Sequence, residues 1–307
     1  MRYCSAGTSE SSGYYHCVED YLTENPMITT GFDHDITAGS LHALMEHVRG
    51  LRGIDFTVYK PGTIRRRLQL RLAATGMPDY ASYHKYLIEN PGEMDALIDS
   101  LTIKVSYFFR NPFVFEALHE FVLPEIMDAF KDDTLRIWCA GCATGEEPYS
   151  LAILLKEFIK KEAISPKVFI IGTDIDRQAL KDAEKALYSA DSLSEVKKGC
   201  LDRHFTFKDG LYRLDEEIRS MVTFAYHDVT DLSPPREGIF SDYHLIFCRN
   251  VLIYFEQDTC KKVLNSLSGF ILQSGCLALG EAEAMPPELM NDFEEALRKT
   301  KLFRRVK

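Results

Sequence analysis

The stretch RIWCAGCATGEEPYSLAILL, from Arg136 to Leu155, decides the fold. An apolar run is followed by two glycines, two adjacent carboxylates and a second apolar run with helical spacing. This order predicts a buried strand, a tight turn and a helix, which form the first crossover of a nucleotide-binding sheet. Gly141 and Gly145 would let the backbone turn sharply and approach a ligand closely.

The ligand that this turn favours carries no phosphate. Glu146 and Glu147 stand at the predicted helix N-terminus, where a pyrophosphate would be repelled. The glycines are not followed by the Lys-Ser/Thr pair of a P-loop. A cationic adenosine compound such as S-adenosylmethionine fits better. On this stretch alone, an equally good interpretation is that both glutamates complement the helix dipole.

Strand-like and helical segments alternate along the rest of the chain. The predicted strands lie in LRIWCAG, KVFIIGTDID, MVTFAYHDV, YHLIFCRN and CLALGEAE, with helical stretches between them. This alternation predicts an α/β fold with a doubly wound, mostly parallel, Rossmann-like sheet. RHFTFKDGLYRLD predicts a hairpin that turns at Asp209 and Gly210, so residues 190–214 are expected to form a small β insertion.

The first third of the chain differs in character. Residues 1–35 are polar and aperiodic and predict a flexible tail. Between residues 36 and 115 the apolar positions follow helical spacing, as in LHALMEHVRGL and TIRRRLQLRLAA. We therefore expect a small all-helical domain at 36–115 and the α/β domain at 116–307.

Polar groups mark the ends of the predicted strands: Asp174, Asp228 with Val229, and Arg249 with Asn250. Asp174 is suited to hold the ribose hydroxyls of a nucleoside, and Asp228 with Val229 is suited to an adenine edge. Asp176, two residues after Asp174, is expected to cap the following helix. Capping would also account for any one of the other acidic positions, but it accounts less well for the whole set.

Composition narrows the function classes. The 307 residues carry a formal net charge of -10, which argues against a nucleic-acid partner. No apolar run is long enough to span a membrane and no secretion signal is evident, so we expect a cytoplasmic protein without membrane insertion. Cys139 and Cys142 form a CxxC pair, but no second pair exists. We therefore expect free thiols and no metal.

Four segments resemble the motifs of the CheR-type chemotaxis methyltransferases: LTIKVSYFFRNPFVFEAL, RIWCAGCATGEEPYSLAILL, GTDID and FCRNVLIYF. The resemblance runs from about residue 41 to the C-terminus. It implies transfer of a methyl group from S-adenosylmethionine to glutamate side chains of chemoreceptors, with S-adenosylhomocysteine as the second product. The same resemblance implies a helical domain joined to a methyltransferase domain that carries a β insertion.

The resemblance also implies a set of cofactor contacts: Ser106, Arg110, Glu146, Asp174, Asp228, Val229, Arg249 and Asn250. Arg110 would reach the cofactor carboxylate, Glu146 its amino group and Asp174 its ribose. Tyr254 would line the methyl-transfer cleft as the catalytic residue, although a tyrosine buried in the core is an equally good interpretation. The sequence departs from the family pattern at two positions. Lys104 stands where the family usually has an asparagine, and Asp228 stands where the family often has one.

The expected partner is the helical cytoplasmic domain of a chemoreceptor. Its methylation helices are acidic, and a basic helix could steer them through Arg65, Arg66, Arg67 and Arg71. A solvated charged face is the alternative. The short hairpin FKDGLY resembles the family branch that works without a receptor-tail peptide tether.

Two other functions remain open on the sequence. Lys104 motivates a non-catalytic module that senses S-adenosylmethionine or docks on receptors. A methyltransferase for another substrate, such as a small molecule or RNA, is the second, because fold does not fix substrate.

Overall fold

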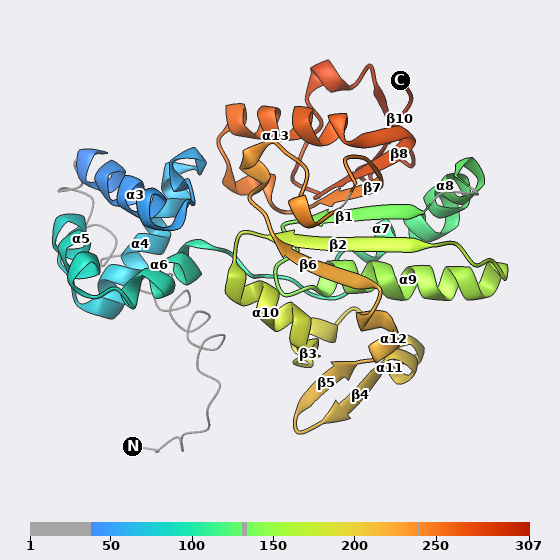
Figure 1. Cartoon of the computed structure of the whole chain (residues 1–307), viewed down its shortest axis with the longest axis horizontal. Coiled ribbons are helices and arrows are strands. Elements are labelled where there is room, and N and C mark those ends of the chain that lie inside the picture. Colours follow the sequence, from blue (N-terminus) through green and yellow to red (C-terminus); the bar gives the residue numbers. More distant parts are fainter. Residues whose placement is uncertain (1–37, 131–133, 239) are drawn as a thin grey trace. The chain divides into compact units, whose positions relative to one another are not determined.

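The computed structural model describes residues 38–130, 134–238 and 240–307 (Figure 1). The tail expected at residues 1–35 lies outside these ranges. The described chain divides into two compact units. One comprises residues 38–57 and 61–101, and the other comprises residues 58–60 and 102–307. In the described part of the chain, no helix has the length and apolar character that a membrane span needs.

The first unit is helical, which confirms the prediction of a small all-helical domain. Its helices are α3 (Ala38–Arg52), α4 (Pro61–Thr75), α5 (Tyr80–Glu89) and α6 (Glu93–Leu101). The apolar stripe predicted from helical spacing is buried at Leu44, Met45 and Val48. Asp79 caps α5, because its carboxylate accepts a hydrogen bond of 2.7 Å from the Ser82 amide.

The division between the units lies between residues 101 and 102, before the boundary expected near 115. Contacts of the segment that follows explain this position. The Thr102 hydroxyl donates to Asp176 at 2.7 Å, and the Lys104 ammonium lies 3.0 Å from the same carboxylate. The Phe108 amide donates to the Ser192 carbonyl at 2.8 Å. These bonds attach the segment to the second unit.

The second unit contains a seven-stranded sheet of order β6-β2-β1-β7-β8-β10-β9. Its strands are β1 (Leu135–Ala140), β2 (Val168–Asp174), β6 (Val222–Tyr226), β7 (Tyr243–Cys248), β8 (Ile271–Leu279), β9 (Phe293–Glu295) and β10 (Leu302–Arg305). The first five in this order run parallel, whereas β10 pairs antiparallel with both β8 and β9. The predicted, mostly parallel sheet is confirmed. The sequence did not reveal β9 and β10, which are too short to show a period.

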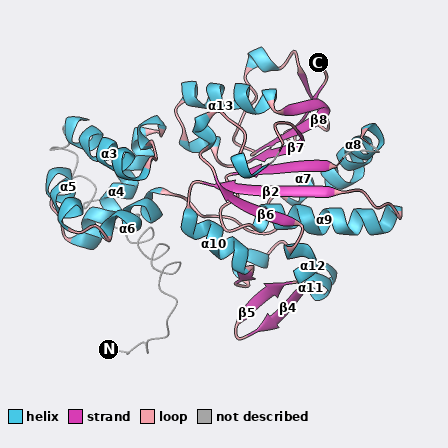
Figure 2. Ribbon diagram, in the orientation of Figure 1, coloured by secondary structure: helices cyan, strands magenta, loops and turns pink. Residues whose placement is uncertain are grey.

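Helices cover both faces of this sheet (Figure 2). They are α7 (Pro112–Ala117), α8 (Leu123–Ala129), α9 (Glu146–Glu162), α10 (Arg177–Lys185) and α13 (Gln257–Gly269), while the short α12 (Glu216–Arg219) contacts α9. Side chains alternate along β1, so Ile137 packs in one core with Leu151 of α9, and Trp138 packs in a second core with Leu264 of α13. The doubly wound arrangement follows from this alternation.

The expected β insertion is present as a separate three-stranded antiparallel sheet of order β3-β5-β4. Its elements are β3 (Leu187–Tyr188), α11 (Lys198–His204), β4 (Phe205–Lys208) and β5 (Leu211–Leu214). The hairpin turns at the predicted pair, since Asp209 and Gly210 have φ of 52° and 82°. The sheet begins at Leu187 rather than at residue 190.

Candidate functional site

The carboxyl ends of four neighbouring parallel strands meet at one edge of the sheet. Register pairs Ala140 of β1 with Thr173 of β2, and Asp174 of β2 with Tyr226 of β6. On the other side β7 continues the same edge beside β1. Open α/β sheets bind ligands at this end of their strands. We call this region, with its residues Glu146, Asp174, Asp228 and Asn250, the strand-end site.

The turn after β1 follows a path that requires its glycines. Gly141 and Gly145 have φ of 76° and 90°, and Ala143 between them has φ of 48°. A Cβ on Gly141 would lie 2.3 Å from a methyl carbon of Val251. The turn is held by the Thr173 carbonyl, which accepts from the Gly141 amide at 2.8 Å. The backbone therefore lies close to the β7 loop, as a ligand cradle needs.

Glu146 is a buried carboxylate at the first residue of α9, with only 2% of its surface exposed. The Thr144 hydroxyl lies 2.8 Å from each of its oxygens, and the Ser106 hydroxyl also bonds to it. Burial raises the pKa of Glu146. Two predicted cofactor residues, Ser106 and Glu146, are thus in contact although they are far apart in sequence. A cationic amino group would give the buried Glu146 carboxylate a partner of opposite charge.

Glu147 has a different environment from its neighbour. Its carboxylate lies 3.0 Å from the Arg249 guanidinium, and the two side chains are 14% and 1% exposed. Arg249 also donates to the Arg110 carbonyl at 2.9 Å and to the Asn111 side-chain oxygen at 2.8 Å. Burial raises the pKa of Glu147, and the Arg249 charge opposes that rise. The Arg249 side chain, expected to contact the cofactor, thus bonds to protein groups that shape the site.

The segment around Arg110 is a compact, strained loop. Phe109 and Asn111 have φ of 54° and 61°, in the left-handed region that non-glycine residues avoid. The Arg110 guanidinium donates to the Val105 carbonyl at 3.0 Å and lies over the Tyr107 ring at 5.5 Å. Arg110 is only partly buried, so its charge remains accessible to an anionic group such as an amino-acid carboxylate.

The two carboxylates after β2 have separate roles. Asp174 accepts from the Ala143 amide at 2.8 Å and from the Asp176 amide at 2.9 Å, and burial raises its pKa to about 6. Asp176 caps α10 by accepting from Gln178 and Ala179, as predicted. Lys104 pairs with Asp176, so its departure from the family pattern places a cation on the helix cap.

Asp228 and Val229 follow β6 at the same edge. Asp228 accepts from the Thr230 amide at 2.8 Å and from its hydroxyl at 2.7 Å, so it caps a short 3-10 helix. Burial raises the pKa of Asp228. Val229 packs partly buried against the core on the α13 face. The capping alternative is therefore realised at Asp228, while its carboxylate stays at the strand-end site.

Glu283 organises the loop after β7, and the sequence analysis missed it. Its buried carboxylate accepts four backbone hydrogen bonds of 2.6–3.1 Å, from Gly280, Asn250, Val251 and Leu252. This cradle holds Asn250 at a φ of 60°. The only signal in the sequence is an acidic residue in the apolar-flanked stretch GEAEAMPP, which does not disclose its partners.

Tyr254 ends the short 3-10 helix η6 (Leu252–Tyr254) and is partly buried. Its carbonyl accepts a hydrogen bond of 2.8 Å from the Lys60 amide. Tyr254 lies four residues past Asn250 on the loop that Glu283 holds. Its assignment to the methyl-transfer cleft stays a prediction.

The arginines of α4 fall into two groups. Arg65 and Arg66 are exposed, and Arg67 is partly buried. Arg71 makes a two-pronged ion pair with Glu93, with nitrogen–oxygen distances of 2.7–3.0 Å. The Tyr83 hydroxyl donates to the same carboxylate at 2.7 Å. Arg71 therefore ties α4 to α6, and its part in binding the substrate stays a prediction.

Cys139 and Cys142 are buried free thiols. Burial raises the pKa of both well above the usual value, which keeps them protonated and unreactive. A cluster of possible metal ligands, Glu157, Cys200 and His204, lies elsewhere, with ligand atoms within 4.8 Å of one another. The Arg203 guanidinium already donates to Glu157, so this cluster is an ion-pair network around a carboxylate.

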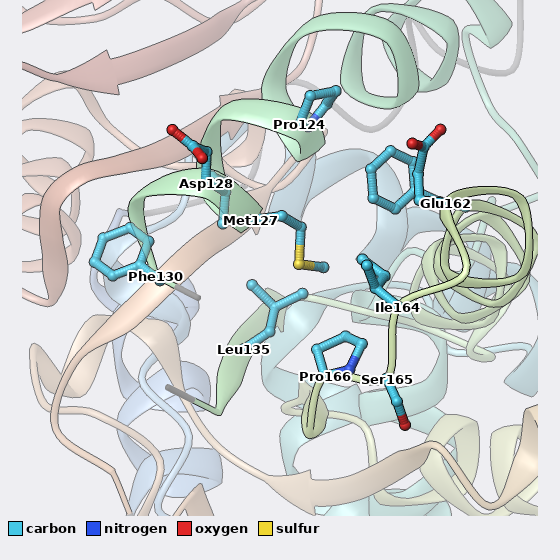
Figure 3. Close-up of a pocket in the computed structure, with 11 residues that line it drawn as sticks. Pro124, Met127, Asp128, Phe130, Leu135, Glu162, Ile164, Ser165 and Pro166 are labelled. Carbon is cyan, nitrogen blue, oxygen red and sulfur yellow. The ribbon is translucent and has the colours of Figure 1, made fainter. Parts of the chain in front are cut away.

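A cavity of about 590 Å³ opens at the other end of the sheet (Figure 3). Leu135, the first residue of β1, lies on its wall with Met127 and Pro166. The amino ends of parallel strands are not where this fold binds ligands. We therefore do not assign the cofactor to this cavity.

Comparison with known proteins agrees with this geometry. Residues 104–302 match the CheR methyltransferase SAM binding domain, and residues 40–102 match the CheR methyltransferase all-alpha domain. The chain belongs to the CheR methyltransferase family. This confirms the resemblance drawn from the motifs. The second unit of the fold is thus a SAM-binding methyltransferase domain.

Several relatives carry functional names. The "Chemotaxis protein methyltransferase" of Borreliella burgdorferi is 30% identical over 82% of this chain and 90% of its own length. The "Chemotaxis protein methyltransferase 2" of Vibrio cholerae is 33% identical over 76% of this chain and 81% of its own length. A 104.1 kDa protein of Rhodobacter capsulatus is 33% identical, and this chain covers 27% of it. The family therefore occurs both alone and within longer proteins.

Glu283→Gln should destabilise the second unit. The amide would place an NH₂ group against backbone N–H donors, so we expect a loss of about 2–4 kcal/mol in the free energy of unfolding. Urea denaturation followed by circular dichroism measures this loss. Glu288→Gln, at an exposed position, is the matched control and should change stability by no more than about 0.5 kcal/mol. Equal stability of the two variants would contradict the role assigned to Glu283.

Proposed function

We propose that this protein transfers a methyl group from S-adenosylmethionine to glutamate carboxylates in the helical cytoplasmic domain of chemoreceptors, forming methyl esters and S-adenosylhomocysteine. The observation that carries the proposal is the buried Glu146, held by the hydroxyls of Thr144 and Ser106, at the end of the turn whose Ala143 amide binds Asp174. The negative charge of such a site attracts a cationic nucleoside and repels phosphate. The relatives named as chemotaxis methyltransferases support the substrate class.

Each residue of the strand-end site has a proposed part in holding the cofactor. Glu146 accepts from its amino group, Arg110 pairs with its carboxylate, and Asp174 accepts from its ribose hydroxyls. Asp228 and Val229 border the adenine. Ser106, Arg249 and Asn250 complete the set, with Arg249 acting through the Arg110 loop that it holds. The absence of a side chain at Gly141 lets the turn after β1 pack against Val251 of the β7 loop.

The reaction needs alignment more than proton transfer. S-adenosylmethionine supplies a methyl group bound to a positively charged sulfur. When the methyl group is transferred, the sulfur keeps the electron pair of the broken bond. A glutamate side chain has a reference pKa of about 4.3, so its oxygen is already an anionic nucleophile at neutral pH. No base is required. The protein instead holds the cofactor, excludes water and orients the carboxylate, a task we assign to Tyr254.

Base lability of the product tests the proposal. The protein is incubated with methyl-labelled S-adenosylmethionine and a chemoreceptor cytoplasmic domain, and the labelled receptor is treated with mild base. Release of volatile methanol is expected, because carboxyl methyl esters hydrolyse in base. Label that resists base would exclude a carboxyl ester. Cofactor binding without any label on the receptor would favour the non-catalytic module instead.

Cofactor affinity should depend on pH through Asp174. Burial raises its pKa to about 6, and below that pH the carboxyl is neutral, so its hydrogen bonds with the ribose hydroxyls lose the strength that the charge gives them. We expect the affinity for S-adenosylhomocysteine to be constant above pH 7 and about tenfold lower at pH 5. Calorimetry between pH 5 and pH 8 measures it. Asp174→Asn should bind weakly and lose this step, whereas Asp191→Asn, at an exposed carboxylate, should keep it.

Charge reversal on α4 separates substrate steering from cofactor binding. Arg65→Glu with Arg66→Glu should slow receptor methylation by about tenfold at low salt, because the acidic receptor helices are no longer attracted. Affinity for S-adenosylhomocysteine should not change. Arg298→Glu with Lys299→Glu alters the net charge equally at other exposed positions and should leave the rate as it is. If the methylation rate of the α4 variant is unchanged, the arginines of α4 form only a solvated charged face and do not steer the substrate.

The protein is proposed to act in the cytoplasm, where the receptor domain that it would modify lies. Independence from a receptor-tail tether stays a prediction, based on the short turn of the insertion.

A further inference from the structure

A three-residue segment, Val58–Lys60, belongs to the methyltransferase unit although the chain on both sides belongs to the helical unit. It pairs with the chain that follows η6. The Glu256 amide donates to the Val58 carbonyl at 3.1 Å, and the Lys60 amide donates to the Tyr254 carbonyl at 2.8 Å. Tyr59, between them, forms an antiparallel bridge with Phe255. These two hydrogen bonds and the isolated bridge attach the segment to the methyltransferase unit.

The Tyr59 ring is fixed by packing. It meets the Phe255 ring edge-on, with centroids 4.8 Å apart and planes at 76°. It also packs against the core on the α13 face, as do Val229 and Val251. Val229 is one of the residues expected at the adenine, and Val251 touches the glycine turn. The ring thus shares its core surface with two parts of the strand-end site.

The Tyr59 hydroxyl lies in an acidic environment. Burial raises its pKa, and the charges of Asp228 and Asp174 raise it further. The phenol is therefore a protonated hydrogen-bond donor at every physiological pH. Its electrostatic neighbours are the two carboxylates that we assign to the adenosine. The Tyr59 hydroxyl could donate a hydrogen bond to a ring nitrogen or a ribose oxygen of a nucleoside, and the neighbouring carboxylates could accept from its hydroxyl and amino groups.

We infer that Tyr59 is a cofactor-binding residue, which closes the nucleoside end of the strand-end site by contact of its ring and hydroxyl with the adenosine. The inference rests on the proposed cofactor pocket but not on the proposed glutamate substrate. It also gives a reason for the position of Val58–Lys60: Lys60 directly precedes Pro61, the first residue of α4. Tyr59 thus lies two residues before the helix that carries the arginines proposed to bind the substrate.

The test compares ligands that share the nucleoside. Affinities for S-adenosylhomocysteine and for 5′-methylthioadenosine, which lacks the amino-acid part, are measured by calorimetry. Tyr59→Phe keeps the ring and loses one hydrogen bond, so both ligands should bind about three- to tenfold more weakly. Tyr59→Ala should weaken both by about 10- to 100-fold. Arg110→Ala should weaken only S-adenosylhomocysteine, because its proposed partner is the missing carboxylate.

Controls separate binding from folding. Tyr212→Phe removes a phenol hydroxyl from β5 in the same unit and should leave both affinities unchanged. Thermal unfolding without ligand should give Tyr59→Phe the midpoint of the unaltered protein, since its ring still packs on Phe255. Affinities of both Tyr59 variants within about twofold of the unaltered protein would overturn the inference. Weakening of S-adenosylhomocysteine alone would overturn the assignment to the nucleoside.

The outcome is independent of the methylation assay. An unaltered protein that binds S-adenosylhomocysteine but forms no base-labile ester refutes the proposed substrate and leaves Tyr59 to be judged on affinity. Unchanged affinities in the Tyr59 variants, together with ester formation, refute only the assignment of Tyr59. A protein that binds neither ligand refutes both.

Discussion

The ion pair between Glu147 and Arg249 is the interaction on which the strand-end site depends. It joins the first turn of α9 to the end of β7, and the same guanidinium holds the Arg110 carbonyl and the Asn111 side chain. Three segments far apart in sequence are thus fixed by one buried cation. Removing one partner of such a pair leaves an uncompensated charge in the interior, at a cost of several kcal/mol. The loop that presents Arg110 cannot be placed without it.

Three carboxylates of this region, Glu146, Glu147 and Glu283, are satisfied in three different ways, and the differences suggest what the site is for. Glu147 is balanced by a guanidinium, and Glu283 by four backbone amides. Glu146 receives hydrogen bonds from the neutral hydroxyls of Thr144 and Ser106. A buried carboxylate is most stable with a positive partner. The amino group of the proposed cofactor would supply that partner, and its charge would lower the cost of burial that now raises the pKa of Glu146.

The sequence predicted what is encoded locally. The strand–turn–helix at Gly141, the cap at Asp176 and the hairpin turn at Asp209 each depend on residues within a few positions. It could not predict pairings between distant residues. Arg249 meets Glu147 across 102 residues, and Arg71 is bound by Glu93, which no periodicity indicates. The strands β9 and β10 are defined by their partners in the sheet, and the segment Val58–Lys60 by its bonds to the chain around Phe255, rather than by their own composition.

Backbone strain is present in the loops of the strand-end site, as it is in several turns elsewhere in the described chain. Phe109, Asn111, Ala143 and Asn250 all have positive φ, and all lie in the loops of the strand-end site. Each such residue costs of order 1 kcal/mol or more and persists only when its surroundings hold it. Here Arg249, Asp174 and Glu283 hold these loops through backbone and side-chain bonds. A displacement that needs no general base gains its rate from alignment of the reacting groups. Loops that buried charged residues hold in a fixed, strained conformation would provide such alignment.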